Sequence, residues 1–172
     1  MTVNDPAATR IAEDDHGPRA VFEDIEEGKD LGVIEWQITE ADVEKQCLID
    51  HDYHPWYFRD SPFGGRIAPP QIQYRPPRWL FSRNYNVRGV FYKWEFENTG
   101  PLVVGDTVHV SGRIGKKWVE RDREYVSFES VGTDSKGTVL FRTTRTHVLD
   151  MVKRTAPRAG RGVDSGIKKE KI

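Results

Sequence analysis

The chain has 172 residues, a formal net charge of -1 and 37% hydrophobic residues, which fits one domain with a single buried core. The small net charge excludes a general attraction to nucleic acid or to an anionic membrane. One cysteine excludes an intrachain disulfide and fits a reducing compartment. Because we find neither a membrane-length apolar run nor a secretion signal, we expect a cytoplasmic protein without nucleic-acid or membrane partners.

Composition divides the chain into three parts. Residues 1–20 are polar and lack periodicity, so they predict a flexible N-terminal arm. Residues 151–172 are basic and also lack an apolar pattern, which predicts a flexible C-terminal tail. Residues 21–150 carry the apolar patterning and form the predicted domain.

The first regular elements are a strand and a short helix. Residues 34–38 alternate between apolar and polar side chains, the pattern of a half-buried strand. Thr39 is followed three residues later by Asp42, an acidic variant of the capping box. This predicts a helix over about residues 40–48, with Cys47 buried on it as a small apolar group.

A segment rich in ionisable groups follows this helix. Residues 50–58 read Asp-His-Asp-Tyr-His-Pro-Trp-Tyr-Phe. Aspartate and histidine this close together can exchange protons near neutral pH if they line a pocket. The alternative is an ordinary loop in which these side chains bond to the backbone of turns.

The second half of the chain predicts one longer helix and then an antiparallel sheet. The helix should cover about residues 70–82, with either a kink at Pro76-Pro77 or a start near Pro77. Only this helix is large enough to cover the apolar face of the sheet, so the sheet should curl around it. The expected fold class is α+β. The expected late strands are residues 90–96, 107–114, 125–131 and 138–149.

Three segments of this domain resemble one family. Residues 47–55, 63–68 and 104–108 are similar to motifs of the MaoC-like (R)-specific enoyl-CoA hydratases and dehydratases, above all the N-terminal FAS1-like dehydratase half. The resemblance covers about residues 21–150. It implies a single hotdog domain, a sheet wrapped around a central helix. It also implies a hydro-lyase that hydrates or dehydrates an enoyl or 3-hydroxyacyl thioester of CoA or acyl-carrier protein, without a cofactor.

The resemblance assigns the acid–base residues. In the family an aspartate and a histidine five residues later share one water molecule. Asp52 falls on the aspartate, His54 on an asparagine of the family, and Tyr57 on the histidine. Phenol is a poorer base than imidazole at pH 7. His54 would have to replace the imidazole, with Tyr57 bonding to water or substrate.

The resemblance also assigns the substrate-binding segment. Pro70 falls on the glycine whose N–H holds the thioester carbonyl, and proline has no N–H to offer. The N–H groups of Gln71 or Ile72 could substitute, because a helix start leaves several donors available. The remaining predicted substrate-binding residues are Gly65, Ile67 and Ala68.

Three functions remain open from the sequence. The sequence fits a hydro-lyase that acts by itself, and it also fits a substrate-holding subunit whose partner hotdog chain supplies the Asp–His pair. A hotdog acyl-CoA thioesterase is the third. We expect a homodimer or heterodimer that buries residues 90–96, because a single sheet has exposed edges. We expect no metal site, because the chain has no cysteine pair and no suitable histidine spacing.

Overall fold

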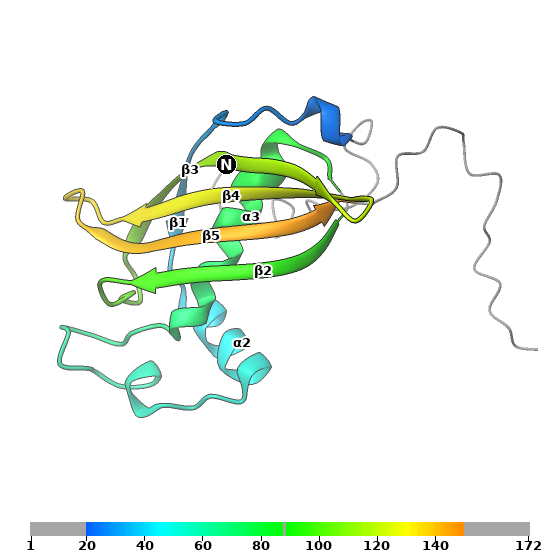
Figure 1. The fold of residues 1–172 in the computed structure, drawn as a ribbon. Coiled ribbons are helices and arrows are strands. Elements are labelled where there is room, and N and C mark those ends of the chain that lie inside the picture. The colour runs from blue at the N-terminus through cyan, green and yellow to red at the C-terminus, as the bar shows by residue number, and fades with distance from the viewer. Residues whose placement is uncertain (1–19, 88, 150–172) are drawn as a thin grey trace, which may run out of the picture.

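A computed structural model describes residues 20–87 and 89–149. Five strands, two α-helices and three short 3-10 turns form the fold (Figure 1). Their bounds are η1 Phe22–Asp24, β1 Asp30–Gln37, α2 Glu40–Asp50, η2 Pro55–Tyr57, η3 Pro70–Tyr74, α3 Arg75–Asn84, β2 Gly89–Asn98, β3 Thr107–Glu120, β4 Arg123–Thr133 and β5 Val139–Leu149.

The strands form one antiparallel sheet in the order β1-β3-β4-β5-β2. The sheet curves in front of α3, while α2 and the segment after it lie below (Figure 1). β1 and β2 are the two edge strands. The predicted α+β class is therefore confirmed, and each of the four predicted late strands is present.

The central helix has two parts because of its prolines. Residues Pro70–Tyr74 form the 3-10 turn η3, and α3 starts at Arg75. Pro76 and Pro77 occupy the first turn of α3, where no intrahelical N–H is required. The alternative of a helix starting near Pro77 was thus the better one. α3 packs on β1, β3 and β4, and the buried core includes Trp36, Ile72, Leu80, Phe81, Val108, Phe128 and Phe141.

The capping prediction for α2 is confirmed. The Thr39 hydroxyl accepts the Asp42 N–H at 3.1 Å and donates to the Asp42 carboxylate at 2.7 Å. The helix continues to Asp50, beyond the predicted end near residue 48. His51 then takes a left-handed conformation (φ 52°) and its N–H caps the carbonyl of Cys47, which turns the chain toward the ionisable segment.

The sequence prediction ended the second late strand too early. β3 runs to Glu120 and joins β4 through Arg121 and Asp122, both with positive φ (50° and 58°). Such a turn normally carries glycine or asparagine, so local sequence gave no signal for it. The predicted arm and tail lie outside the described residues. Within the described part, no helix has the length and apolarity to span a membrane.

Candidate functional site

Asp52 and Tyr57 form a hydrogen-bonded pair. The Tyr57 hydroxyl donates to Asp52 Oδ2 at 3.1 Å. Asp52 is half-buried, and Tyr57 is 7% exposed. The short turn η2 brings the phenol back over the carboxylate, five residues away in sequence. The position that the family resemblance gives to histidine therefore does reach the aspartate.

The Tyr57 hydroxyl does not titrate near neutral pH. Burial, followed by the hydrogen bond to Asp52 and the charge of that carboxylate, raises the pKa of Tyr57 to about 12. The same surroundings affect Cys47, which is buried at the end of α2. Burial first, and then the charges of Asp52 and Asp50, raises the pKa of its thiol. Both groups therefore stay protonated at pH 7.

His54 lies beside this pair but is exposed. Its Nδ1 accepts the Trp56 N–H at 3.3 Å, so the imidazole caps the turn η2. Its backbone N–H donates to Asp52 Oδ1 at 3.2 Å, and its ring centroid lies 5.5 Å from that of Tyr57. The structure thus brings Asp52, His54 and Tyr57 together, with the phenol and not the imidazole on the carboxylate.

Polar links fix this segment to α2 and join α2 to α3. Arg66 donates from Nε to the Tyr57 carbonyl at 3.0 Å and pairs with Glu40 at the start of α2 at 3.0 Å. Arg75 at the start of α3 pairs with Asp42 at 3.2 Å and donates to Gln46 at 3.1 Å. Arg66 therefore ties the ionisable segment to α2, and Arg75 ties α2 to α3.

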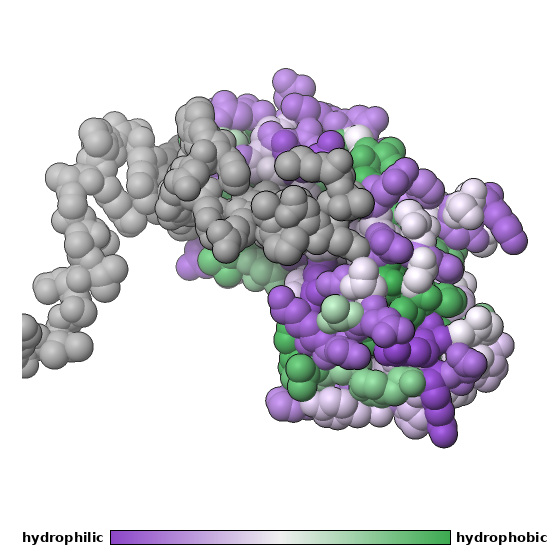
Figure 2. Space-filling model, turned by 180° about the vertical axis from the view of Figure 1, so that it is seen from behind, coloured by the Kyte–Doolittle hydropathy of each residue, from purple (hydrophilic) through white to green (hydrophobic). Residues whose placement is uncertain are grey.

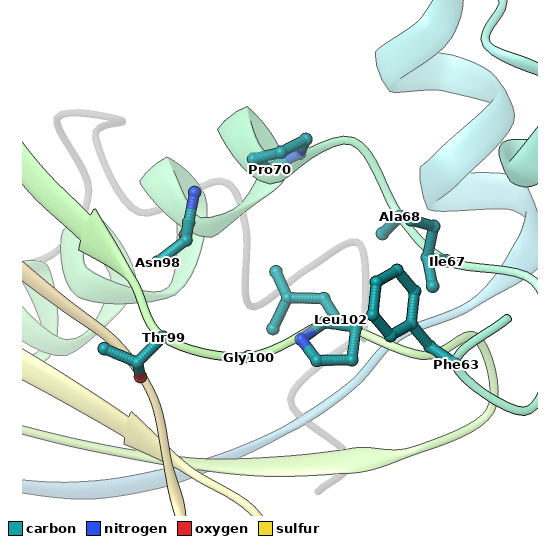
Figure 3. A pocket seen from close by; sticks show the side chains of 9 residues that line it. Phe63, Ile67, Ala68, Pro70, Asn98, Thr99, Gly100 and Leu102 are labelled. Carbon is teal, nitrogen blue, oxygen red and sulfur yellow. The ribbon is translucent and has the colours of Figure 1, made fainter. Parts of the chain in front are cut away.

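A pocket of about 330 Å³ opens next to this segment (Figure 3). One wall comes from the chain leading into η3 and the other from the chain after β2, and the two are joined by the Ala68 N–H donating to the Leu102 carbonyl at 2.7 Å. The side chains that line it are mainly apolar. They are Phe63, Ile67, Ala68, Pro70, Asn98, Thr99, Pro101 and Leu102, together with Gly100.

The predicted substrate-binding residues divide into three groups. Ile67 and Ala68 line the pocket, whereas Gly65 lies just before them and its carbonyl accepts the Ser61 N–H at 2.9 Å. Gln71 is exposed at the start of η3. The Ile72 side chain is fully buried, and its N–H already donates to the Pro69 carbonyl at 3.0 Å. Of the two proposed backbone donors, only Gln71 is therefore a candidate.

The pair Asp52–Tyr57 lies next to the pocket without lining it. The Ile67 N–H donates to the Trp56 carbonyl at 3.0 Å, and the Trp56 ring meets the Phe63 ring edge-on at 5.9 Å. Two lining residues are therefore in direct contact with the residue that precedes Tyr57.

Sequence reasoning missed the second wall of the pocket. The run Asn98-Thr99-Gly100-Pro101 only marks the end of the predicted strand 90–96 in the sequence. In the structure Asn98 points toward the start of η3 (Figure 3), and its Oδ1 accepts a hydrogen bond from Nε2 of the fully buried Gln73. This bond directs the Asn98 NH₂ group away from Gln73. No local signal marks this role, because it depends on β2 returning alongside η3.

This chain resembles known proteins in its structure and not in its sequence. Neither a family model nor a curated protein matches the sequence. Solved structures do match. The R-hydratase PhaJ1 from Pseudomonas aeruginosa has a TM-score of 0.62 and 16% identity over 74% of this chain and 84% of that chain. The MaoC-like dehydratase from Rhodospirillum rubrum has a TM-score of 0.58 and 20% identity over 74% and 94%.

The chain has the hotdog fold. The complex HadBC, a (3R)-hydroxyacyl-ACP dehydratase from Mycobacterium tuberculosis, matches as well, with a TM-score of 0.62 and 16% identity over 71% of this chain and 96% of that chain. The fold in which Asp52, Tyr57 and the pocket are set is thus the one that these hydratase and dehydratase structures have. Among the described residues no group of three or more His, Cys, Asp or Glu is arranged to hold a metal ion.

Proposed function

We propose that this protein is one chain of a hydratase or dehydratase that acts on an acyl thioester of CoA or acyl-carrier protein. In this proposal the chain holds the acyl group, and a second hotdog chain supplies the acid–base pair. The observation that supports it is the hydrogen bond between Tyr57 and Asp52. A phenol occupies the position at which the resemblance places a catalytic histidine.

The chemistry explains why this bond matters. Adding water across an enoyl thioester requires one group that takes a proton from water and one that gives a proton to carbon. A group does both best when its pKa is close to the working pH. With a pKa of about 12, Tyr57 is ionised in only about one molecule in 100,000 at pH 7. Tyr57 therefore serves as a fixed hydrogen-bond donor to Asp52.

The pocket supports the holding role. Its walls are mainly apolar, as an acyl chain requires. Pro70 offers no N–H to a thioester carbonyl, and the Thr99 hydroxyl already donates to the Val139 carbonyl at 2.6 Å. The NH₂ group of Asn98 is the side-chain donor that the described lining provides for that carbonyl.

The exposed edge of the sheet is an argument for pairing with a second chain. β2 is an edge strand, and its exposed apolar residues include Val90, Phe91, Tyr92 and Phe96. An exposed apolar edge of this kind is a site for strand pairing. HadBC and ChsH1-ChsH2 from Mycobacterium tuberculosis, two of the matching structures, are named as complexes of two chains. Sedimentation at micromolar concentration should show a dimer, and a monomer would contradict the pairing.

A second candidate is a hydratase that needs no partner. The observation in its favour is the position of His54, whose N–H binds Asp52 and whose ring adjoins that of Tyr57. Asp52 and His54 would then handle the water, as the family resemblance first suggested. For this the imidazole has to turn from its capping bond toward the pocket.

One assay separates the two candidates. The purified chain is mixed with crotonyl-CoA and with a longer enoyl-CoA, and the enoyl absorbance and free thiol are followed. For the chain alone we expect no change in enoyl absorbance or in free thiol. We also expect octanoyl-CoA to bind to the chain in a calorimetric titration. Hydration by the chain alone that is lost in Asp52→Asn would establish the second candidate. Thiol release at constant enoyl absorbance would instead identify a thioesterase.

A further inference from the structure

A buried arginine lies on the helix side of β5. Arg145 is 5% exposed, and its guanidinium carbon lies 4.7 Å from the ring centre of Phe91 and 5.9 Å from those of Tyr74 and Phe128. Its Nη1 donates to the Tyr74 carbonyl oxygen. Its Nε is buried without a hydrogen-bond partner. The cation is therefore removed from water, with rings and one carbonyl around it.

A second arginine, on the helix, lies close enough to Arg145 to repel its charge. Arg78 on α3 is half-buried and donates to the Ser82 hydroxyl. Burial, and then the repulsion from Arg78, lowers the pKa of Arg145 to about 10. Among residues 20–87 and 89–149 no carboxylate forms an ion pair with either guanidinium. Two desolvated like charges without a counter-charge are unfavourable, and a bound anion relieves both costs.

His147 adds a neutral hydrogen-bonding group to this cluster. It lies two residues beyond Arg145 on the same face of β5, is 5% exposed, and its Nε2 has no partner. Burial, and then the charges of Arg145 and Arg78, lowers its pKa to about 3, so it is neutral at pH 7. A neutral imidazole with its hydrogen on Nε2 can donate to an anion without adding a third charge.

A row of residues on β2 leads from the pocket to this cluster. Trp94 lies opposite Arg145 in the sheet register, and Phe96 and Asn98 follow on the same face. Asn98 lines the pocket, and Tyr74 meets Trp94 edge-on at 6.4 Å. At the rise of an antiparallel strand, four residues separate the pocket wall from the level of Arg145 by about 14 Å. The row thus has an amide at the pocket, two aromatic rings beyond it, and the cation Arg145 opposite its far end.

We propose that Arg145 and Arg78 bind a carboxylate at the far end of the acyl group, so that the thioester held by this chain is that of a dicarboxylic acid. The inference rests on the proposed function, because it takes the ligand to be an acyl thioester. The thioester end lies at the pocket beside Asn98 and Pro70, and the hydrocarbon follows Phe96 and Trp94. The distal carboxylate meets the Nε side of Arg145, where Nε–H and the adjacent Nη2–H form a fork that matches its two oxygens.

The surroundings favour a carboxylate over a phosphate. Three aromatic rings enclose the guanidinium of Arg145, and His147 is neutral. A phosphate monoester carries nearly two charges at pH 7 and is more strongly hydrated than a carboxylate. A site with one fully buried arginine and one half-buried arginine matches a single negative charge that has left water.

The test compares two CoA thioesters of equal carbon number by titration calorimetry on the full chain. Octanoyl-CoA ends in a methyl group and suberyl-CoA in a carboxylate. We expect suberyl-CoA to bind about ten- to a hundredfold more tightly, the range for hydrogen bonds to a charged group. Arg145→Met and, independently, Arg78→Met should remove most of this preference. Arg142→Met, an exposed position on the same strand, is the matched control and should retain it.

Three outcomes decide against the proposal in different ways. Equal affinity of the wild type for the two thioesters overturns the dicarboxylic inference and leaves the proposed function intact. An equal loss of affinity for free CoA, octanoyl-CoA and suberyl-CoA in Arg145→Met assigns the cluster to a CoA phosphate and also overturns it. Binding of neither thioester, in a protein that melts cooperatively, overturns the proposed function itself.

Discussion

Replacing Tyr57 by histidine should give this chain a hydratase activity that the wild type lacks. The Tyr57 hydroxyl oxygen lies 3.1 Å from Asp52 Oδ2. Imidazole is shorter than phenol, so the substitution leaves the place of that oxygen empty between the new ring and the carboxylate. A water molecule can take this position and contact both groups. The variant would then hold the water that a hydration reaction consumes.

The expected gain in hydration rate follows from the pKa values of tyrosine and histidine at position 57. Tyr57 has a pKa of about 12, whereas histidine ordinarily titrates near 6.5. At pH 7 the basic fraction rises from about one in 100,000 to about three quarters. A positioned acid–base group contributes about 10²–10⁴ in rate, and this is the gain we expect over the wild-type background. Pro70→Gly should add to it, because a missing carbonyl donor costs about 10²–10³.

The assay is the loss of enoyl absorbance with crotonyl-CoA. Tyr57→Phe is the matched control, since it also removes the hydroxyl but supplies no imidazole, and it should stay inactive. Asp52→Asn added to Tyr57→His should abolish the gain. The reasoning is refuted if Tyr57→His binds octanoyl-CoA as the wild type does and yet shows no hydration above Tyr57→Phe.

Three further predictions concern stability. The unfolded chain protonates His147 near pH 6.5 and the folded chain only near pH 3, so its contribution to stability is complete above pH 6.5 and is lost as the pH falls toward 3. His147→Gln should flatten that slope in urea melts. Gly132→Ala places a Cβ 2.2 Å from the Phe141 ring and should cost about 1–3 kcal/mol. Thr39→Ala removes the cap of α2 and should cost about 1 kcal/mol, whereas Thr39→Ser should retain most of it.

Each of these three stability predictions has an outcome that would contradict it. An unchanged slope between pH 6.5 and 3 in His147→Gln would mean that this histidine is accessible to protons in the folded state. A Gly132→Ala protein as stable as the wild type would mean that the Phe141 ring has room to move. Equal unfolding midpoints for Thr39→Ala and Thr39→Ser would show that the hydroxyl does not cap α2.

The elements of the fold were predictable wherever the cause is local. The alternation of residues 34–38 marks β1, because one face of that strand is buried and the other exposed. Thr39 and Asp42 mark the start of α2 through bonds that span three residues. The prediction failed at the turn after Glu120, because two ordinary residues adopt positive φ there under the constraint of the hairpin.

The candidate site was predictable in its members but not in their arrangement. Residues 50–58 stood out by composition, and Asp52, His54 and Tyr57 do lie together. Which side chain meets the carboxylate depends on the left-handed turn at His51 and on η2, and composition does not report either. The pocket wall at Asn98 depends on a pairing between segments more than twenty residues apart in sequence.

The sequence by itself determined the α+β class, the approximate positions of the strands, the start of α2 and the segment that concentrates acid and imidazole groups, because each of these follows from interactions within a few residues along the chain. Only the tertiary structure decided that the Tyr57 phenol donates a hydrogen bond to the Asp52 carboxylate. It also decided that Arg145 on β5 meets the carbonyl of Tyr74, 71 residues away, beside Arg78. The physical reason is that burial and charge proximity arise from the order of strands in the sheet and the helix packed on it, and these bring together groups that have no local relation.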